Sequence, residues 1–139
     1  MSVERTFSIV KPDAVAAGHA GEILAAIEAA GFKVLALRMT RLSDAQARGF
    51  YAVHIARPFF EGLVKFMTEG PIVVMALERE NAIAGLREVM GATNPEKAAD
   101  GTIRKRFATN IERNAIHGSD GPETAAAELG FFFSAAEFL

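Results

Sequence analysis

The sequence predicts an α/β (α+β) fold, in which a single domain over residues 1–139 has a β-α-β-β-α-β, ferredoxin-like core with extra helices inserted. Three observations support this. A chain of 139 residues suits one domain and can bury a real core. Half of the residues are apolar, without any low-complexity run. Strand-like runs are separated by helical segments, which indicates helices packed on a sheet. The order alone does not exclude a small doubly wound sheet.

In the first half of the chain, strand and helix signals alternate with clear stops between them. Gly31 is a helix stop, Ser43 is a good N-cap, and Pro58 suits a helix start. We predict, in order, a strand over residues 6–10, a helix over 22–30, a strand over 32–42, a helix from Ser43 to about Tyr51 and a helix over 59–67.

The second half begins with a continuous apolar run, typical of a buried central strand. The segment GATNPEKAADG is a long loop rich in turn residues, and such loops are often functional. Pro122 suits the first turn of a helix. We predict a strand over residues 72–77, a helix over 80–90, the loop over 91–101, a strand around 115–117 and a helix over 122–132.

Composition narrows the classes of function. The chain has no cysteine, which excludes disulfides and thiolate sites. Its net charge of −2 does not indicate a general affinity for nucleic acid. No apolar run approaches the roughly 20 residues that cross a bilayer, so we expect no membrane partner. The start, MSVERTFSIV, carries charges where a signal peptide needs its apolar part. We therefore expect a cytoplasmic protein.

Three histidines are candidates for chemistry, and none belongs to a zinc-binding pair, so we predict no metal ligands in the protein. His19 lies in a Gly-His-Ala-Gly turn and is expected at the surface. His54 lies among aromatic residues in YAVHIARPFF, where it either caps a helix end or contacts a ligand. His117 lies in NAIHGSD, whose other residues are common in turns. On these letters alone, His117 is either an ordinary turn residue or a reactive group.

Three cations, Lys11, Arg87 and Arg104, lie beside turn residues on separate segments. If these segments converge, the cations neutralise a polyphosphate, for which arginine is well suited. The alternative is that each is simply solvated. Neither a P-loop nor a G-x-G-x-x-G motif is present, so a nucleotide here is held by side chains.

Six segments in order carry a resemblance that covers nearly the whole chain: ERTFSIVKPDAV, FYAVHIARPFF, LVKFMTEGPIVVMALERENAI, MGATNP, GTIR and NAIHGSD. With them the sequence resembles the nucleoside diphosphate kinase family. The resemblance implies an antiparallel ferredoxin-like sheet with helices on one face. It also implies that His117 takes the γ-phosphate from a nucleoside triphosphate and passes it to a diphosphate. Imidazole is mostly neutral at pH 7 and is then a nucleophile without a helper base, and a covalent intermediate gives ping-pong kinetics.

The resemblance also implies roles for other residues. Lys11 and Tyr51 match catalytic residues beside the transferred phosphate, and Ser119 and Glu128 match a pair that supports the histidine. The residues that match nucleotide contacts are Lys11, His54, Phe59, Arg87, Thr93, Arg104, Ile111 and Asn114. Mg²⁺ is expected as a cofactor bound mainly through the nucleotide phosphates. The family also implies a homo-oligomer, a tetramer or hexamer built from dimers.

The sequence departs from the family after GTIR, where Lys105-Arg106 replaces a small residue and Asp. We predict that residues 104–106 are extended, so that Arg104 and Arg106 share one side and Lys105 faces away. Arg106 then meets solvent or a neighbouring subunit. Two alternatives stay open. Arg104, Lys105 and Arg106 beside Phe107 suit a non-catalytic nucleotide or nucleic-acid binder, and His117 also suits a carrier that passes phosphate to a protein.

Overall fold

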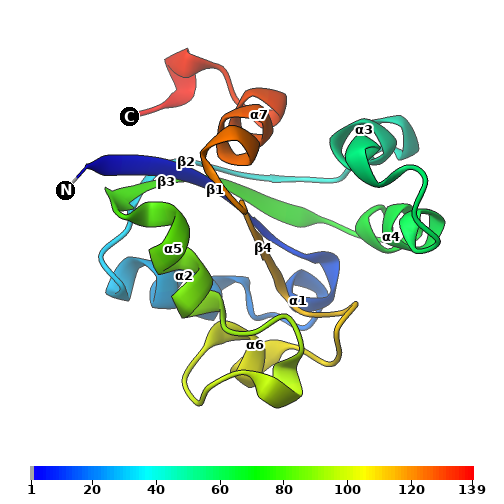
Figure 1. Ribbon diagram of the computed structural model, residues 1–139, viewed down its shortest axis with the longest axis horizontal. Coiled ribbons are helices and arrows are strands. Elements are labelled where there is room, and N and C mark those ends of the chain that lie inside the picture. Colours follow the sequence, from blue (N-terminus) through cyan, green and yellow to red (C-terminus); the bar gives the residue numbers. More distant parts are fainter. Residues whose placement is uncertain (1) are drawn as a thin grey trace.

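A four-stranded sheet forms the centre of the molecule, seen in a computed structural model that describes residues 2–139 (Figure 1). Its strands are β1 (Val3–Val10), β2 (Lys33–Thr40), β3 (Ile72–Glu80) and β4 (Ile116–Gly118). They lie in the order β2-β3-β1-β4 and every neighbouring pair is antiparallel. This is the order of a ferredoxin-like sheet, and it excludes the doubly wound alternative, which needs parallel strands.

Helices cover both faces of this sheet, so the expectation of helices on one face is wrong. The helices are α1 (Pro12–Ala16), α2 (Ala20–Ala29), α3 (Asp44–Phe50), α4 (Phe60–Met67), α5 (Ala82–Met90), α6 (Ile103–Phe107) and α7 (Pro122–Phe132). In Figure 1, α7 lies above the sheet, α3 and α4 lie at its right-hand end, and α2, α5 and α6 lie below it. Residues of α3, α4 and α7 share one core cluster. None of the helices within residues 2–139 is both long and apolar enough to cross a membrane.

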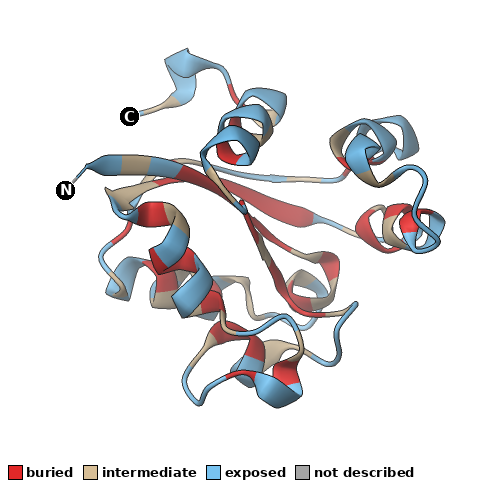
Figure 2. Cartoon of the chain, in the orientation of Figure 1, coloured by how far each residue is buried: buried red, intermediate tan, exposed pale blue. Residues whose placement is uncertain are grey.

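Alternation along the central strands explains the two faces. Ile72, Val74 and Ala76 of β3 belong to the core under α3, α4 and α7. The residues that alternate with them belong to the core under α2 and α5, namely Val73, Met75 and Leu77. Successive strand residues point to opposite faces, so a continuous apolar run indicates a strand buried on both sides. Figure 2 shows this burial as the red stretches of the central strands.

Most predicted elements are present, with shifted ends. Ser43 does cap α3, because its Oγ accepts from the Gln46 amide while its own amide donates to Gln46 Oε1. Helix α7 has its predicted bounds. The first strand starts at Val3 and the third continues to Glu80, so α5 begins at Ala82. The last strand begins at Ile116 because Ala115 has a φ of 74°, which no strand residue adopts. Short 3₁₀ turns occur at Ala52–His54, Pro95–Lys97 and Ala135–Glu137.

Two short helices are absent from the sequence prediction. The sequence predicts no helix between residues 10 and 22, but Pro12 is the first residue of α1, a position where proline is favoured. Residues 104–106 are not extended, since they lie in α6, whose N-cap Thr102 accepts a hydrogen bond from the Lys105 amide. Both helices carry or adjoin predicted site residues, so these two corrections change the geometry of the site.

Candidate active site

His117 lies on the edge strand β4, opposite Ile9 of β1. Its carbonyl accepts a hydrogen bond of 2.8 Å from Ser8 Oγ. The imidazole centroid is 6.1 Å from the ring of Phe7 and 5.9 Å from that of Phe50. Strand pairing therefore holds the backbone while aromatic rings line the side chain, which stays 21% exposed. The imidazole is both held and accessible.

A carboxylate fixes the orientation and the tautomer of this ring. His117 Nε2 lies 2.8 Å from Glu128 Oε1, and Ser119 Oγ donates to the same oxygen over 2.7 Å. An ionised carboxylate only accepts hydrogen bonds, so Nε2 carries the proton. Nδ1 then keeps its lone pair, and no hydrogen bond within residues 2–139 occupies it. The arrangement thus presents one ring nitrogen as a nucleophile. Glu128 reaches the histidine from α7, as the resemblance implies.

Tyr51 lies at the C-terminal end of α3 and is buried. Burial, and then the charge of Glu128, raise the pKa of its hydroxyl, which therefore stays protonated. This hydroxyl has no hydrogen-bond partner in the part of the chain described. A buried hydroxyl without a partner is unfavourable, and an incoming oxygen acceptor would satisfy it. Its ring lies 4.8 Å from that of Phe50, which in turn lies 5.9 Å from the imidazole of His117.

Lys11 follows β1 directly, and its Nζ donates to Asn114 Oδ1 over 2.8 Å. Burial lowers the pKa of this ammonium to about 8, and the nearby charge of Arg104 adds to the effect. Asn114 Nδ2 in turn donates to the Thr93 carbonyl at 3.5 Å. The structure therefore joins the first segment, the 91–101 loop and the histidine segment in one polar network.

Arg104 lies in α6 and is buried, so the alternative that it is simply solvated is wrong. Its guanidinium donates to the carbonyls of Ile116, Gly91 and Asn114, at 2.7, 3.2 and 3.4 Å. Burial and the charge of Arg87 lower its pKa to about 10, so it remains charged at neutral pH. Arg106, on the other side of the short helix, lies 3.5 Å from Glu22 and over the Phe107 ring. Arg104 and Arg106 therefore do not share a side.

Arg87 lies in the last turn of α5, and its Nη1 donates to Asp120 Oδ1 over 2.9 Å. With Thr93 and Arg104 it lines a hollow of about 400 Å³. The charges of Arg87 and Arg104 act on each other, and that of Arg104 acts on Lys11. The three predicted cations therefore do converge, although two of them lie on helices. Such a cluster attracts a polyanion.

The two residues predicted to sandwich a base, Phe59 and Ile111, are 52% and 58% exposed and belong to neither core cluster. Phe59 precedes α4, and its ring centroid is 5.4 Å from that of His54. The loop that carries Ile111 is tied to the far end of α4, because Arg113 binds Glu69 at 2.8 Å. Exposed apolar side chains on two such segments are available to a planar ligand.

Sequence reasoning missed three neighbours of this site. Asp120 pairs with Arg87, Phe50 packs on His117, and Asp13 contacts the backbone before the histidine. Asp120 and Asp13 were visible, since they lie within NAIHGSD and Lys-Pro-Asp. Phe50 gave no signal apart from its apolar character. His19 was expected at the surface, but its ring is partly buried and lies 4.6 Å from that of Phe107.

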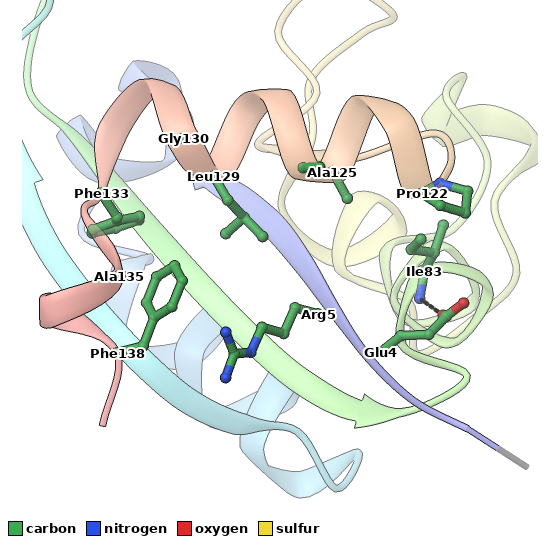
Figure 3. Close-up of a pocket in the computed structure, with 11 residues that line it drawn as sticks. Glu4, Arg5, Ile83, Pro122, Ala125, Leu129, Gly130, Phe133, Ala135 and Phe138 are labelled. Carbon is green, nitrogen blue, oxygen red and sulfur yellow. Dashed lines mark hydrogen bonds between the residues drawn. The ribbon is translucent and has the colours of Figure 1, made fainter.

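A second hollow, of about 460 Å³, lies between α7 and β1 (Figure 3). It is lined by Leu129, Phe133 and Phe138, with Glu4 and Arg5 at its side. Glu4 accepts from the Ile83 amide, and Arg5 binds Glu78, so both charged groups already have partners. None of the predicted site residues lines this hollow. The predicted phosphate contacts Arg87, Thr93 and Arg104 instead line the hollow beside α5 and α6.

The sheet is ferredoxin-like, and a histidine and three cations gather beside it. This set of side chains indicates a protein that handles phosphate groups. Comparison with known proteins makes this specific. The family model for nucleoside diphosphate kinase matches residues 4–138. The nucleoside diphosphate kinase of Halorhodospira halophila is 61% identical over 137 residues, covering 99% of this chain and 97% of that protein. That of Maricaulis maris is 60% identical over 139 residues, covering 100% and 99%.

Solved structures agree. The Aquifex aeolicus nucleoside diphosphate kinase superposes with a TM-score of 0.97 at 47% identity, covering 99% of this chain and 100% of that one. A halophilic nucleoside diphosphate kinase from Halobacterium salinarum, solved in complex with CDP, gives 0.94 at 38% identity, covering 99% and 92%. The chain belongs to the nucleoside diphosphate kinase family. This confirms the resemblance and the class of enzyme that the motifs predict.

Proposed function

We propose that the enzyme transfers the γ-phosphate of a nucleoside triphosphate to a nucleoside diphosphate through a phosphohistidine at His117. The observation that carries the proposal is the contact between His117 Nε2 and Glu128, which leaves Nδ1 free. In the first step, Nδ1 attacks the γ-phosphorus and the bond to the β-phosphate oxygen breaks. The proton on Nε2 stays in place, and Glu128 stabilises the positive charge that the ring acquires.

The second step is the reverse of the first with another base. A terminal β-phosphate oxygen of the acceptor attacks the phosphorus, the phosphorus–nitrogen bond breaks, and its electron pair returns to Nδ1. Lys11, Arg87 and Arg104 neutralise the phosphate charge, and the unpartnered hydroxyl of Tyr51 donates to an oxygen of the group in transit. Phosphoryl transfer depends mainly on such positioning and charge stabilisation.

The nucleotide is held along the line from the cations to α4. Thr93 contacts the phosphates with Arg87, and His54 gives a further phosphate contact.

The nucleoside is held by other residues. Asn114 binds the ribose beside Lys11, and Phe59 and Ile111 enclose the base. The relative from Halobacterium salinarum was solved in complex with CDP, which supports nucleotide binding by this chain. Ser119 takes no part in binding, since its buried hydroxyl serves Glu128.

Mg²⁺ enters with the nucleotide, as the metal complex of its phosphates. Residues 2–139 contain no group of three histidine or acidic side chains able to hold a metal ion, and Mg²⁺ often binds through substrate phosphates and water. The exposed Asp120 carboxylate is engaged by Arg87. We further propose a cytoplasmic homo-oligomer, a tetramer or hexamer assembled from dimers, which does not act on nucleic acid or membranes.

Incubation with γ-labelled ATP, removal of nucleotide and addition of GDP tests the proposal. We expect an acid-labile label on the protein that moves to GTP. His117→Ala and His117→Gln should remain unlabelled with unchanged circular dichroism, whereas His19→Gln, the matched control, should behave as wild type. A sensor would never take label, and a carrier for proteins would keep its label in the presence of GDP. Label retained by His117→Ala would disprove the role of His117.

A further inference from the structure

The backbone immediately before His117 is strained. Ala115 has a φ of 74°, in the left-handed region that residues with a side chain rarely adopt. The Ile116 amide donates to the Asn114 carbonyl over 2.9 Å, a bond from one residue to the second before it. A central residue at φ near +75° inside such a bond is a γ-turn of the rare, strained kind. Strain of this kind persists only where surrounding contacts impose it.

Both polar backbone groups of Ala115 are held by one short segment. Asp13 Oδ2 accepts a hydrogen bond of 3.1 Å from the Ala115 amide, and the Lys11 amide donates to the Ala115 carbonyl over 2.8 Å. Asp13 lies in the first turn of α1. Ala115 itself is fully buried, so water cannot replace either partner. Arg104 bonds the flanking carbonyls of Asn114 and Ile116. Within residues 2–139, Asp13 is therefore the one side chain that bonds Ala115 itself.

The turn adjoins three groups of the proposed site. Asn114, on its first side, accepts from Lys11 Nζ. The Ile116 carbonyl, on its second side, is the shortest partner of Arg104 at 2.7 Å. His117 follows directly. A change of φ at Ala115 would therefore move the ribose ligand, the phosphate arginine and the nucleophile relative to one another.

We propose that Asp13 is a positioning residue for phosphoryl transfer, which holds Ala115 in its left-handed conformation and so sets the geometry of Asn114 and His117. The proposal rests on the proposed function of His117. Asp13 acts here through the acceptor oxygen it offers to an amide, without touching the nucleotide. A displacement of about 1 Å at a reacting group can reduce the rate by ~10²-fold, so a support of this kind has a large effect on catalysis.

Two substitutions at Asp13 and one at Ala115 separate geometry from charge. Asp13→Ala removes the acceptor, and we expect the single-turnover rate of His117 labelling to fall by about 10²-fold. Asp13→Asn keeps an acceptor oxygen without the charge and should stay within a few-fold of wild type. Ala115→Gly should be close to wild type, because glycine adopts positive φ without penalty. In the double variant Asp13→Ala/Ala115→Gly the turn no longer needs its support, so most of the rate should return.

Controls distinguish this from a loss of folding. The final extent of labelling counts correctly folded molecules, and Asp100→Ala removes an exposed acid from the loop before α6. If Asp13→Ala does not fold, Asp13→Asn and the double variant still decide the question. Equal losses in Asp13→Ala and Asp13→Asn, without rescue by Ala115→Gly, would show that Asp13 acts by charge and would overturn the proposal. So would an unaffected Asp13→Ala. A wild-type protein that takes no label would instead refute the function of His117.

Discussion

Lys11 is an ammonium group in a setting that disfavours its charge. Burial and the neighbouring Arg104 lower its pKa, while Asp13 and Glu112 partly oppose this. The cluster of cations is unfavourable in the free enzyme, and a polyphosphate would relieve the repulsion. The repulsion among these cations raises the free energy of the site without a ligand, and a bound polyphosphate would lower it. This is how the proposed site would bind a polyphosphate without a glycine-rich phosphate loop.

The lowered pKa of Lys11 predicts an alkaline limit to activity. In the proposed mechanism the ammonium binds phosphate, and it is lost as pH rises through about 8 in the free enzyme. We expect kcat/KM to decline above that pH, and kcat to decline only at higher pH because bound phosphate favours the charged form. Lys11→Arg, which stays protonated, should show a lower but flat profile.

The free energy of unfolding should depend on pH with the opposite sign. Between pH 8 and 10.5 the unfolded chain binds more protons, so the folded state gains stability as pH rises.

Phe59 and Ile111 predict weak discrimination between bases. They offer stacking and apolar contact, and every base has a face that can stack. Values of kcat/KM for ADP, GDP, CDP and UDP should lie within about two decades, because differences in apolar contact are worth only ~1–3 kcal/mol. Phe59→Ala should lower all four together. A preference far beyond that range, abolished by changing one polar side chain near the base, would contradict the prediction.

Single residues also show how far sequence reasoning reaches into the site. His117, Glu128 and Ser119 were predicted together, and the structure places them within hydrogen-bond distance. The partner of Arg87 could not be predicted, because Asp120 is 33 residues away and only the fold brings them together. The burial of Arg104 was equally hidden, since the carbonyls it binds are backbone groups that no side-chain pattern reveals. The roles of the nucleotide ligands stay predictions.

The short helix α6 presents its basic residues to different surroundings. Arg104→Ala would leave three carbonyls without their donor and remove a charge from the phosphates. We expect kcat/KM to fall by ~10²-fold or more, and the urea midpoint to fall in line with a loss of ~1–3 kcal/mol. Arg106→Ala loses an exposed pair with Glu22, worth at most ~1 kcal/mol. It and Lys105→Ala should keep rates within a few-fold. A crippled Arg106→Ala enzyme would mean that Arg106 also serves the phosphates.

The junction between α5 and the 91–101 loop depends on glycine. Gly91 has a φ of 85° and a ψ of 177°, a region essentially restricted to glycine. A Cβ there would also lie 2.7 Å from the Cβ of Thr102, the N-cap of α6. Gly91→Ala should therefore destabilise by ~2–4 kcal/mol and weaken nucleotide binding, because the Gly91 carbonyl holds Arg104.

Gly101→Ala is the matched control for this junction. Gly101 has a φ of 86°, but a Cβ there would meet nothing within 4 Å. It should lose only ~1–2 kcal/mol for the left-handed conformation, with nucleotide affinity preserved. Thermal melts and nucleotide titrations of both variants provide the comparison. Equal effects of the two substitutions would show that contact with Thr102 is unimportant.

The elements that were predicted correctly are those with local signals. Ser43 and Gln46 form a capping box, and Pro122 starts α7. The missed helices have only five residues each, too few for a periodic pattern to emerge. Their caps were nevertheless readable, because Pro12 suits a first turn and Thr102 suits an N-cap. The packing of helices on both faces follows from long-range contacts, so a local pattern could not settle it.

At the scale of the whole molecule, one edge of the sheet carries exposed apolar side chains. Leu37 and Met39 of the edge strand β2 are 49% and 60% exposed. They pair with Met75 and Val73 of β3, so they lie on the same face of the sheet as α2. Long exposed edges favour association, and a second copy of the chain is the partner that the proposed homo-oligomer supplies.

This surface predicts a variant that dissociates. Met39→Glu introduces a charge that a subunit contact would have to bury, and we expect light scattering to report smaller particles than wild type. Val53→Glu, at an 87% exposed position before α4, is the control and should leave the mass unchanged. A wild-type monomer would refute the assembly itself, and an undisturbed Met39→Glu oligomer would place the subunit contact elsewhere.

The buried hydroxyl of Tyr51 has a consequence for how this enzyme can be observed. The chain contains one tyrosine and no tryptophan, so emission excited beyond the absorption of phenylalanine comes from Tyr51. That ring touches Phe50, the neighbour of the imidazole, and its hydroxyl senses the Glu128 carboxylate. The protein therefore contains a single tyrosine reporter, which lies beside the proposed reaction centre. Stopped-flow fluorimetry can follow each half-reaction in the unmodified chain, without any introduced label.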